Sequence, residues 1–210
     1  MTVTVTRLYD TYDDALSAVR ELEAAAVPSK DISLLANQSG GGKASDVKRV
    51  DSHGETAGVH AEKDAAMGTA VGGGIGLLTG LGVLAIPGVG PVLGLGWLAA
   101  TALGAATGMA VGAVSGGIVG SLVAEGVPLS DAHVYAEGLR RGGTLLAVRT
   151  SDGMSAKIAT ILDRHDAVDM VSRGADYRKS GWSSFDPAAS PYELGQAKGE
   201  RPRVGAGTVL

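Results

Sequence analysis

The stretch that decides the fold spans residues 65–124 and reads AAMGTAVGGGIGLLTGLGVLAIPGVGPVLGLGWLAATALGAATGMAVGAVSGGIVGSLVA. It contains no Asp, Glu, Lys, Arg or His, and 17 of its 60 positions are glycine. One helical crossing of a bilayer's hydrocarbon core takes about 20 apolar residues, so this run is long enough for two crossings and a turn. We therefore expect a transmembrane helical hairpin here.

Glycines recur at every fourth position in both halves of this run. At 3.6 residues per turn, that spacing aligns them along one slowly drifting face of a helix, where another backbone can approach closely. In lipid such stripes of small residues are packing surfaces, whereas in water each internal glycine costs about 0.8–1 kcal/mol relative to alanine. We predict two glycine-zipper faces, formed by Gly68, Gly72, Gly76 and Gly80 and by Gly104, Gly108, Gly112, Gly116 and Gly120.

A short segment rich in proline and glycine separates the two glycine series. Such residues break helices and favour a tight reversal. We expect one helix over residues 64–85 and a longer one over residues 91–124, with the hairpin turn formed by Pro87, Gly88, Gly90 and Pro91.

Charge predicts how this hairpin is oriented. The turn is uncharged, whereas Lys and Arg residues flank the run on both sides, so the positive-inside rule places both ends in the cytoplasm. The predicted location is the inner (cytoplasmic) membrane, with both termini cytoplasmic. Glycine and alanine bury little apolar area, so two alternatives stay open: a hairpin buried in a cytoplasmic oligomer, and one inserted part-way into a leaflet.

The residues before the run, 1–36, predict one β-α-β unit. Residues 2–9 are rich in β-branched side chains and predict a strand. Thr11 and Asp14 resemble a capping box at the start of a helix that ends at Val27-Pro28. A second strand is expected over residues 31–36, and the helix should bury Leu16, Val19, Leu22 and Ala26.

The residues after the run, 125–173, predict the same order again. We expect helices over residues 130–141 and 154–165, each followed by a strand, over residues 144–150 and 167–171. The inward side chains would be Ala132, Tyr135 and Leu139 on the first helix, and Met154, Ile158, Ile161 and Leu162 on the second.

Neither β-α-β half can bury both faces of its strands alone, so the two should pair. The predicted fold class is α/β: a ferredoxin-like plait made of two β-α-β halves and interrupted by the glycine-zipper helical hairpin over residues 64–124. Residues 37–63 read as a flexible linker, and residues 174–210 as a largely disordered tail.

Four segments carry a family resemblance: the opening residues 6–37, the zipper hairpin around residues 86–91, the return segment 136–145 and residues 181–187. The first three resemble the bacterial general stress protein family with a YflT-type domain, whose members include heat- or low-temperature-induced proteins, and the fourth is similar to related stress proteins. The resemblance implies a bacterial stress role. It brings no established catalytic residues with it.

No motif in the sequence predicts catalysis, a cofactor or a metal site. A net charge of −4, without a basic patch, argues against nucleic-acid binding, and the chain has no cysteine. The start of the chain does not read as a secretory signal peptide. His53 and His60 fall in the predicted linker, which lacks the preorganisation that a metal site needs. His133 and His165 have no nucleophile at a recognisable spacing. We therefore expect a non-enzymatic protein.

Three functions remain open. The first is a stress-induced structural protein that contacts membrane lipid and self-associates through its zipper hairpin, with a cytoplasmic α/β domain. The second is a pore or transport component, although the run lacks the ionisable residues that such paths usually contain. The third is a soluble oligomeric sensor that binds a small ligand of unknown identity.

Overall fold

In the computed structural model, residues 2–38, 82–106 and 117–192 are described, and they form a mixed α/β fold around one antiparallel sheet. The strand order is β1-β5-β2-β4-β3, and every neighbouring pair is antiparallel. The strands are β1 (Thr2–Tyr9), β2 (Ile32–Asn37), β3 (Gly82–Ile86), β4 (Gly90–Leu95) and β5 (Thr144–Ser151). The helices are α1 (Tyr12–Ala24), η1 (Ser29–Asp31), α3 (Trp97–Ala106), α4 (Ile118–Ala124), α5 (Leu129–Arg140), α6 (Asp152–Asp163) and α7 (Met170–Lys179).

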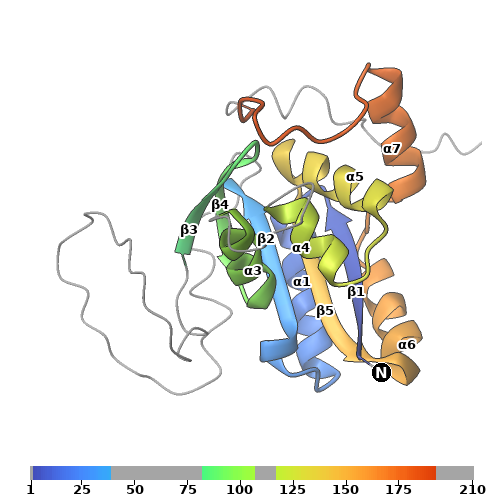
Figure 1. Cartoon of the computed structure of the whole chain (residues 1–210). Coiled ribbons are helices and arrows are strands. Elements are labelled where there is room, and N and C mark those ends of the chain that lie inside the picture. Colours follow the sequence, from blue (N-terminus) through green and yellow to red (C-terminus); the bar gives the residue numbers. More distant parts are fainter. Residues whose placement is uncertain (1, 39–81, 107–116, 193–210) are drawn as a thin grey trace, which may run out of the picture.

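Helices cover both faces of this sheet (Figure 1). α1 and α6 pack on one face, and α3, α4 and α5 lie on the other. The alternation of side chains along a strand supplies both cores. On β1, Leu8 belongs to the core under α5 while its neighbour Tyr9 belongs to the core under α1 and α6.

The predicted N-terminal β-α-β unit is confirmed. Thr11 caps α1, and its side-chain oxygen accepts a hydrogen bond from the backbone N–H of Asp14 at 3.2 Å. Leu16, Val19 and Leu22 are buried as expected. The prediction for Ala26 was wrong: α1 ends at Ala24, and Ala26 is exposed in a left-handed conformation with φ 61°.

The second half differs from its prediction. α5, β5 and α6 lie where they were expected, and β5 pairs with both β1 and β2. The strand expected over residues 167–171 was wrong, because the Asp169 side chain caps α7 by accepting the backbone N–H of Ser172 at 2.7 Å. Val171, which was expected in that strand, is 81% exposed. The two-fold β-α-β plait is therefore incomplete. The prediction for Met154 was also wrong, since its side chain is 40% exposed.

The helical hairpin prediction was wrong over residues 82–95, whereas α3 and α4 are helical within the predicted second helix. Residues 82–95 form the β-hairpin β3–β4, and β4 pairs with β2. The chain reverses direction where the sequence predicts, but the turn joins two strands and not two helices. Pro87 and Gly88 occupy the centre of a type II turn, with Gly88 at φ 75° and the N–H of Val89 bonded to the Ile86 carbonyl at 3.0 Å. Gly90 and Pro91 begin β4, beyond the end of β2.

The rest of the predicted second helix is also divided. α3 starts at Trp97, and α4 starts after Gly117, whose φ of 81° is incompatible with a continuing helix. α3 and α4 pack on the sheet, where Leu98, Ile118 and Leu122 are buried. Within residues 2–38, 82–106 and 117–192, no helix is long and apolar enough to cross a membrane.

The predicted tail also begins with ordered structure. Gly174 lies in α7, and residues 181–192 continue across α5 to the β3–β4 turn (Figure 1). A Cβ on Gly88 would lie 2.7 Å from the Asp186 carbonyl, so the turn and this segment are in close contact. The predicted linker likewise begins inside β2, at Asn37.

Candidate functional site

The outer edge of β1 is the candidate site. β1 is the last strand on its side of the sheet, and only β5 pairs with it. The carbonyls of Thr6 and Leu8 accept bonds from outside the sheet, so even-numbered residues of β1 direct their backbone groups away from β5. The Tyr135 hydroxyl donates to the Thr6 carbonyl, and the Val168 N–H donates to the Leu8 carbonyl. These two bonds cover the C-terminal half of the edge. In the described part of the chain, nothing pairs with the backbone of Thr2 and Thr4 on the outer side.

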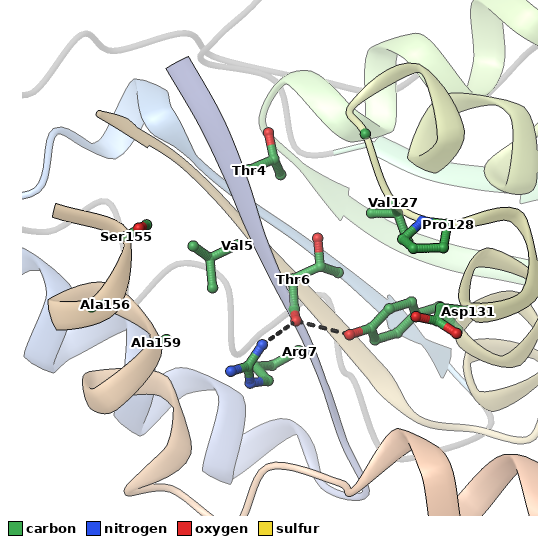
Figure 2. A pocket seen from close by; sticks show the side chains of 12 residues that line it. Thr4, Val5, Thr6, Arg7, Val127, Pro128, Asp131, Ser155, Ala156 and Ala159 are labelled. Carbon is green, nitrogen blue, oxygen red and sulfur yellow. Dashed lines mark hydrogen bonds between the residues drawn. The ribbon is translucent and has the colours of Figure 1, made fainter. Parts of the chain in front are cut away.

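Thr4, in the open half of this edge, lines a groove of about 380 Å³ that continues along Val5, Thr6 and Arg7. Figure 2 shows β1 running between α6 on one side and the segment leading into α5 on the other. Small side chains of α6 form the first wall. We call this hollow the edge groove; it is lined by Thr4, Val5, Thr6, Arg7, Gly126, Val127, Pro128, Asp131, Tyr135, Ser155, Ala156 and Ala159.

The hydroxyl of Thr6 is the unusual group in the edge groove. Thr6 is 5% exposed, and its Oγ1 has no hydrogen-bond partner among the described residues. Burying a hydroxyl without a partner costs about 1–3 kcal/mol, so such groups are rare unless something else satisfies them. The edge groove thus combines free backbone groups with an unsatisfied hydroxyl.

Tyr135 and Arg7 hold the Thr6 carbonyl in place. The Tyr135 hydroxyl donates to it at 2.9 Å, and Arg7 Nη1 donates to it at 2.9 Å (Figure 2). Burial raises the pKa of Tyr135 to about 12, so its phenol stays a donor even at alkaline pH. Arg7 is itself paired with Asp163 at 2.6 Å.

Glu125, at the end of α4, is bonded to both β1 and β5. Thr4 Oγ1 donates to Glu125 Oε2 at 2.8 Å, and Arg149 on β5 donates to both carboxylate oxygens of Glu125. The Arg149 guanidinium also lies 3.7 Å from the ring centroid of Trp97. Burial of Glu125 opposes ionisation, but the hydrogen bonds from Arg149 and Thr4 outweigh it, and the pKa of Glu125 falls below its ordinary value of 4.5.

This lowered pKa predicts a contribution of Glu125 to acid stability. Because the folded-state pKa lies below the unfolded one, the contribution is complete above about pH 5 and is lost as the pH falls through 4.5 and below. We expect Glu125→Gln to reduce stability at pH 7 and to flatten the decline between pH 5 and pH 3. Urea unfolding at pH 7, 5, 4 and 3 measures both effects, and an equal loss at every pH would contradict the assignment.

Of the nine glycines predicted to pack helices, the structure describes two. Gly104 lies in α3 and Gly120 in α4, so they belong to different helices. Gly68, Gly72, Gly76, Gly80, Gly108, Gly112 and Gly116 lie outside the described residues, as do His53 and His60. The role of these seven glycines in helix packing stays a prediction. Of the turn residues, Gly88 and Gly90 contact residues 185–191.

The two remaining histidines have structural partners. His133 Nδ1 accepts the N–H of Phe185 at 3.2 Å, and His165 Nε2 lies 2.7 Å from Glu21 Oε2. No cluster of three metal-ligating side chains occurs within the three described ranges.

Sequence reasoning missed the edge groove because it assigned residues 167–171 to a strand. A strand there, joined to β5 through α6, could have covered this edge. The clue was available: Asp169 and Ser172 have the spacing of a helix cap, which the apolar residues around them obscured.

Comparison of the chain with protein-family models, with curated proteins and with solved structures finds no match. The resemblance to general stress proteins stays a prediction from the sequence segments named above.

Proposed function

We propose that this protein is a non-enzymatic stress-response protein that contacts membrane lipid and self-associates through a glycine-rich arm, residues 65–81. The similarity of several segments to general stress proteins supports the stress role. One structural observation carries the proposal. The arm belongs to residues 39–81, and the sheet holds the strands before and after that segment close together.

Strand pairing places those two ends close together. Asn37 at the end of β2 pairs with Val92 of β4, and Val92 pairs in turn with Leu84 of β3. Neighbouring strands are about 4.8 Å apart, so β2 and β3 are separated by about 10 Å. Residues 39–81 therefore leave and rejoin one sheet, and both ends must lie on the same side of any membrane.

The length of the arm decides how it can meet lipid. It has 17 uncharged residues, six of them glycine. As a helix, these 17 residues would be about 25 Å long. A segment that enters the membrane and returns to the same side by two full crossings needs about 40 apolar residues, so the arm is too short for that. We therefore propose that the arm lies in one leaflet and packs there against other arms through Gly68, Gly72, Gly76 and Gly80. In this proposal the α/β domain and both termini stay on the cytoplasmic side.

The pore alternative loses its main support. It required two zipper helices, but β4, α3 and α4 occupy the described part of the second one and pack into the domain core. We do not carry it further.

Two acidic substitutions in the arm test lipid contact. We expect the wild-type protein to float with vesicles of phosphatidylethanolamine and phosphatidylglycerol, and Val71→Asp/Ile75→Asp to lose this binding by about 100-fold or more, because an Asp in an apolar membrane region costs about 2.5–3.5 kcal/mol. The matched control is Val171→Asp, whose site on α7 is already 81% exposed. Wild-type protein that stays unbound would contradict lipid contact.

Leucines on the predicted stripe test the packing of arms separately. Gly72→Leu/Gly76→Leu should keep lipid binding and reduce crosslinking between vesicle-bound copies, because the close approach of backbones is blocked. An unchanged crosslinking pattern would reject arm packing while leaving lipid contact standing.

A further inference from the structure

We propose that residues 181–192 are a pH-sensitive strap, which lies closed over α5 and the β3–β4 turn while His133 is neutral and opens when His133 gains a proton. The strap runs from the end of α7 across α5 to the turn (Figure 1). This inference goes beyond the proposed function and does not depend on lipid contact.

The strap is seated by one aromatic ring and by close packing against the turn. Phe185 is 6% exposed and belongs to the core under α5. A Cβ on Gly88 would lie 2.8 Å from Pro187 Cα, and a Cβ on Gly90 would lie 2.9 Å from Pro191 Cβ. The closed strap therefore rests directly on the backbone of the β3–β4 hairpin.

Two side chains of α5 hold the strap at two separate points. His133 Nδ1 accepts the Phe185 N–H at 3.2 Å, and Arg140 Nη2 donates to the Ser190 carbonyl at 3.1 Å. His133 and Arg140 are seven positions apart, so they lie two turns apart on one face of the helix. The strap itself belongs to no helix or strand. A segment held in this way can open locally while the sheet stays folded.

The bond between His133 and Phe185 requires a neutral imidazole. A ring nitrogen that accepts an N–H carries no proton, so the proton of the neutral ring lies on Nε2. A second proton would convert Nδ1 into a donor that faces another donor, and the bond would be lost. Histidine is the side chain that ordinarily titrates between pH 5 and pH 8. The closed strap is therefore favoured at the upper end of this range and weakens as the pH falls.

The other charged groups in this part of the fold belong to different classes. In the described part of the chain, the Phe185 N–H is the hydrogen-bond partner of His133. Besides Arg140, the elements packed there carry Asp131 and Glu137 on α5, Asp186 in the strap, Arg173 and Arg178 on α7, and Glu125 at the end of α4. Carboxylates and guanidinium groups ordinarily titrate outside the range from pH 5.5 to pH 8. A response of the strap in that range is therefore assigned to His133.

Amide hydrogen exchange of the full chain without vesicles tests the switch. The Phe185 N–H reports the bond to His133, and the Ala189 N–H, which donates to the Asp186 carbonyl at 3.2 Å, reports the strap beyond it. Each rate is divided by that of an unfolded peptide of the same sequence at the same pH. We expect both ratios to rise by about 2- to 12-fold from pH 8 to pH 5.5, the effect of losing one hydrogen bond. The ratios over β5 should stay constant.

Two substitutions of His133 separate its charge from its role as an acceptor. His133→Asn does not titrate and keeps an acceptor, because its amide oxygen replaces Nδ1. We expect its strap to stay closed, with the same exchange ratios at both pH values. His133→Leu has no acceptor, so its strap should be as open at pH 8 as the wild-type strap is at pH 5.5. His165→Asn is the matched control and should keep the wild-type response, since His165 pairs with Glu21 in the layer of α1 and α6. Circular dichroism verifies that each variant is folded.

A further measurement needs no substitution. Nitrogen NMR of the imidazole at pH 8 should place the proton of neutral His133 on Nε2, and a proton on Nδ1 would overturn the switch. Wild-type exchange ratios that are equal at pH 8 and pH 5.5 would overturn it as well, and so would a response of His133→Asn as large as that of the wild type. These results leave the proposed lipid contact standing, because flotation with vesicles tests that contact separately.

Discussion

Replacing Glu137 by alanine is expected to lower the free energy of unfolding by about 3–5 kcal/mol, the usual cost of breaking a buried ion pair. The Glu137 side chain is fully buried, and it pairs with Arg140 at 3.3 Å and with Arg141 at 2.7 Å. Both arginine side chains are themselves only 16% and 15% exposed. Without Glu137, two cations would remain in a poorly hydrated position at the end of α5.

Urea unfolding at pH 7 measures this effect, and an exposed pair provides the control. Asp176 pairs with Lys179 at 3.0 Å, but the two side chains are 47% and 76% exposed. Asp176→Ala should therefore cost less than about 1 kcal/mol. Equal losses in the two variants would show that burial does not strengthen the Glu137 pairs. Glu137→Gln, which keeps the shape and one acceptor, should fall between the two.

Replacing Gly96 by alanine is expected to cost about 2–5 kcal/mol, for two separate reasons. Gly96 joins β4 to α3 with φ 81°, a conformation that costs other residues about 1–2 kcal/mol. A Cβ there would also lie 2.5 Å from the carbonyl oxygen of Ile32, which is backbone in β2 and cannot rotate away. Overpacking of this kind adds about 1–3 kcal/mol.

Two other glycines separate these contributions. Gly126 has φ 88° and open space around its Cβ position, so Gly126→Ala measures the backbone cost alone. Gly153 lies in α6 with open space and no unusual φ, so Gly153→Ala should be neutral or stabilising by up to about 1 kcal/mol. Thermal and urea unfolding of the three variants provide the comparison. If Gly96→Ala costs no more than Gly126→Ala, the contact with β2 is looser than the structure has it.

The parts of the fold that the sequence predicted well have local causes. The start of α1 follows from the side chain of Thr11 and the N–H of Asp14, three residues apart. The reversal at Pro87-Gly88 follows from the conformational preferences of those two residues, whatever they connect. α5 and α6 carry clear hydrophobic periodicity, and the burial of Leu139, Ile158 and Leu162 agrees with it. β5 is instead a continuous apolar run that is buried from Thr144 to Val148.

The parts that the sequence predicted wrongly depend on distant neighbours. Residues 82–95 carry no charge, and an uncharged apolar run indicates that its surroundings are apolar without distinguishing lipid from protein. Here β2 offered a free edge, and β4 satisfies its backbone by pairing with β2 on one side and with β3 on the other. The short apolar stretch at residues 167–171 was ambiguous for the same reason, and the cap at Asp169 decided it.

The candidate site belongs almost entirely to the second group. The sequence shows that residues 2–6 favour a strand, but whether that strand is central or at an edge depends on what pairs with it. Among the described residues, the outer backbone of Thr4 is open and the Thr6 hydroxyl has no hydrogen-bond partner. The walls beside them come from α5 and α6, more than a hundred positions away in the chain.

The amino-acid sequence by itself determined the mixed α/β class, the helix caps, the turn at residues 86–89 and the uncharged arm at residues 65–81. Each of these depends on side chains within a few positions of one another. The tertiary structure alone decided that β3, β4, α3 and α4 join the domain core, and that β1 is an edge strand in the described part of the sheet. A strand forms its hydrogen bonds with segments that are distant in the sequence. Its own residues therefore favour an extended, pairing conformation but do not determine which strand it pairs with.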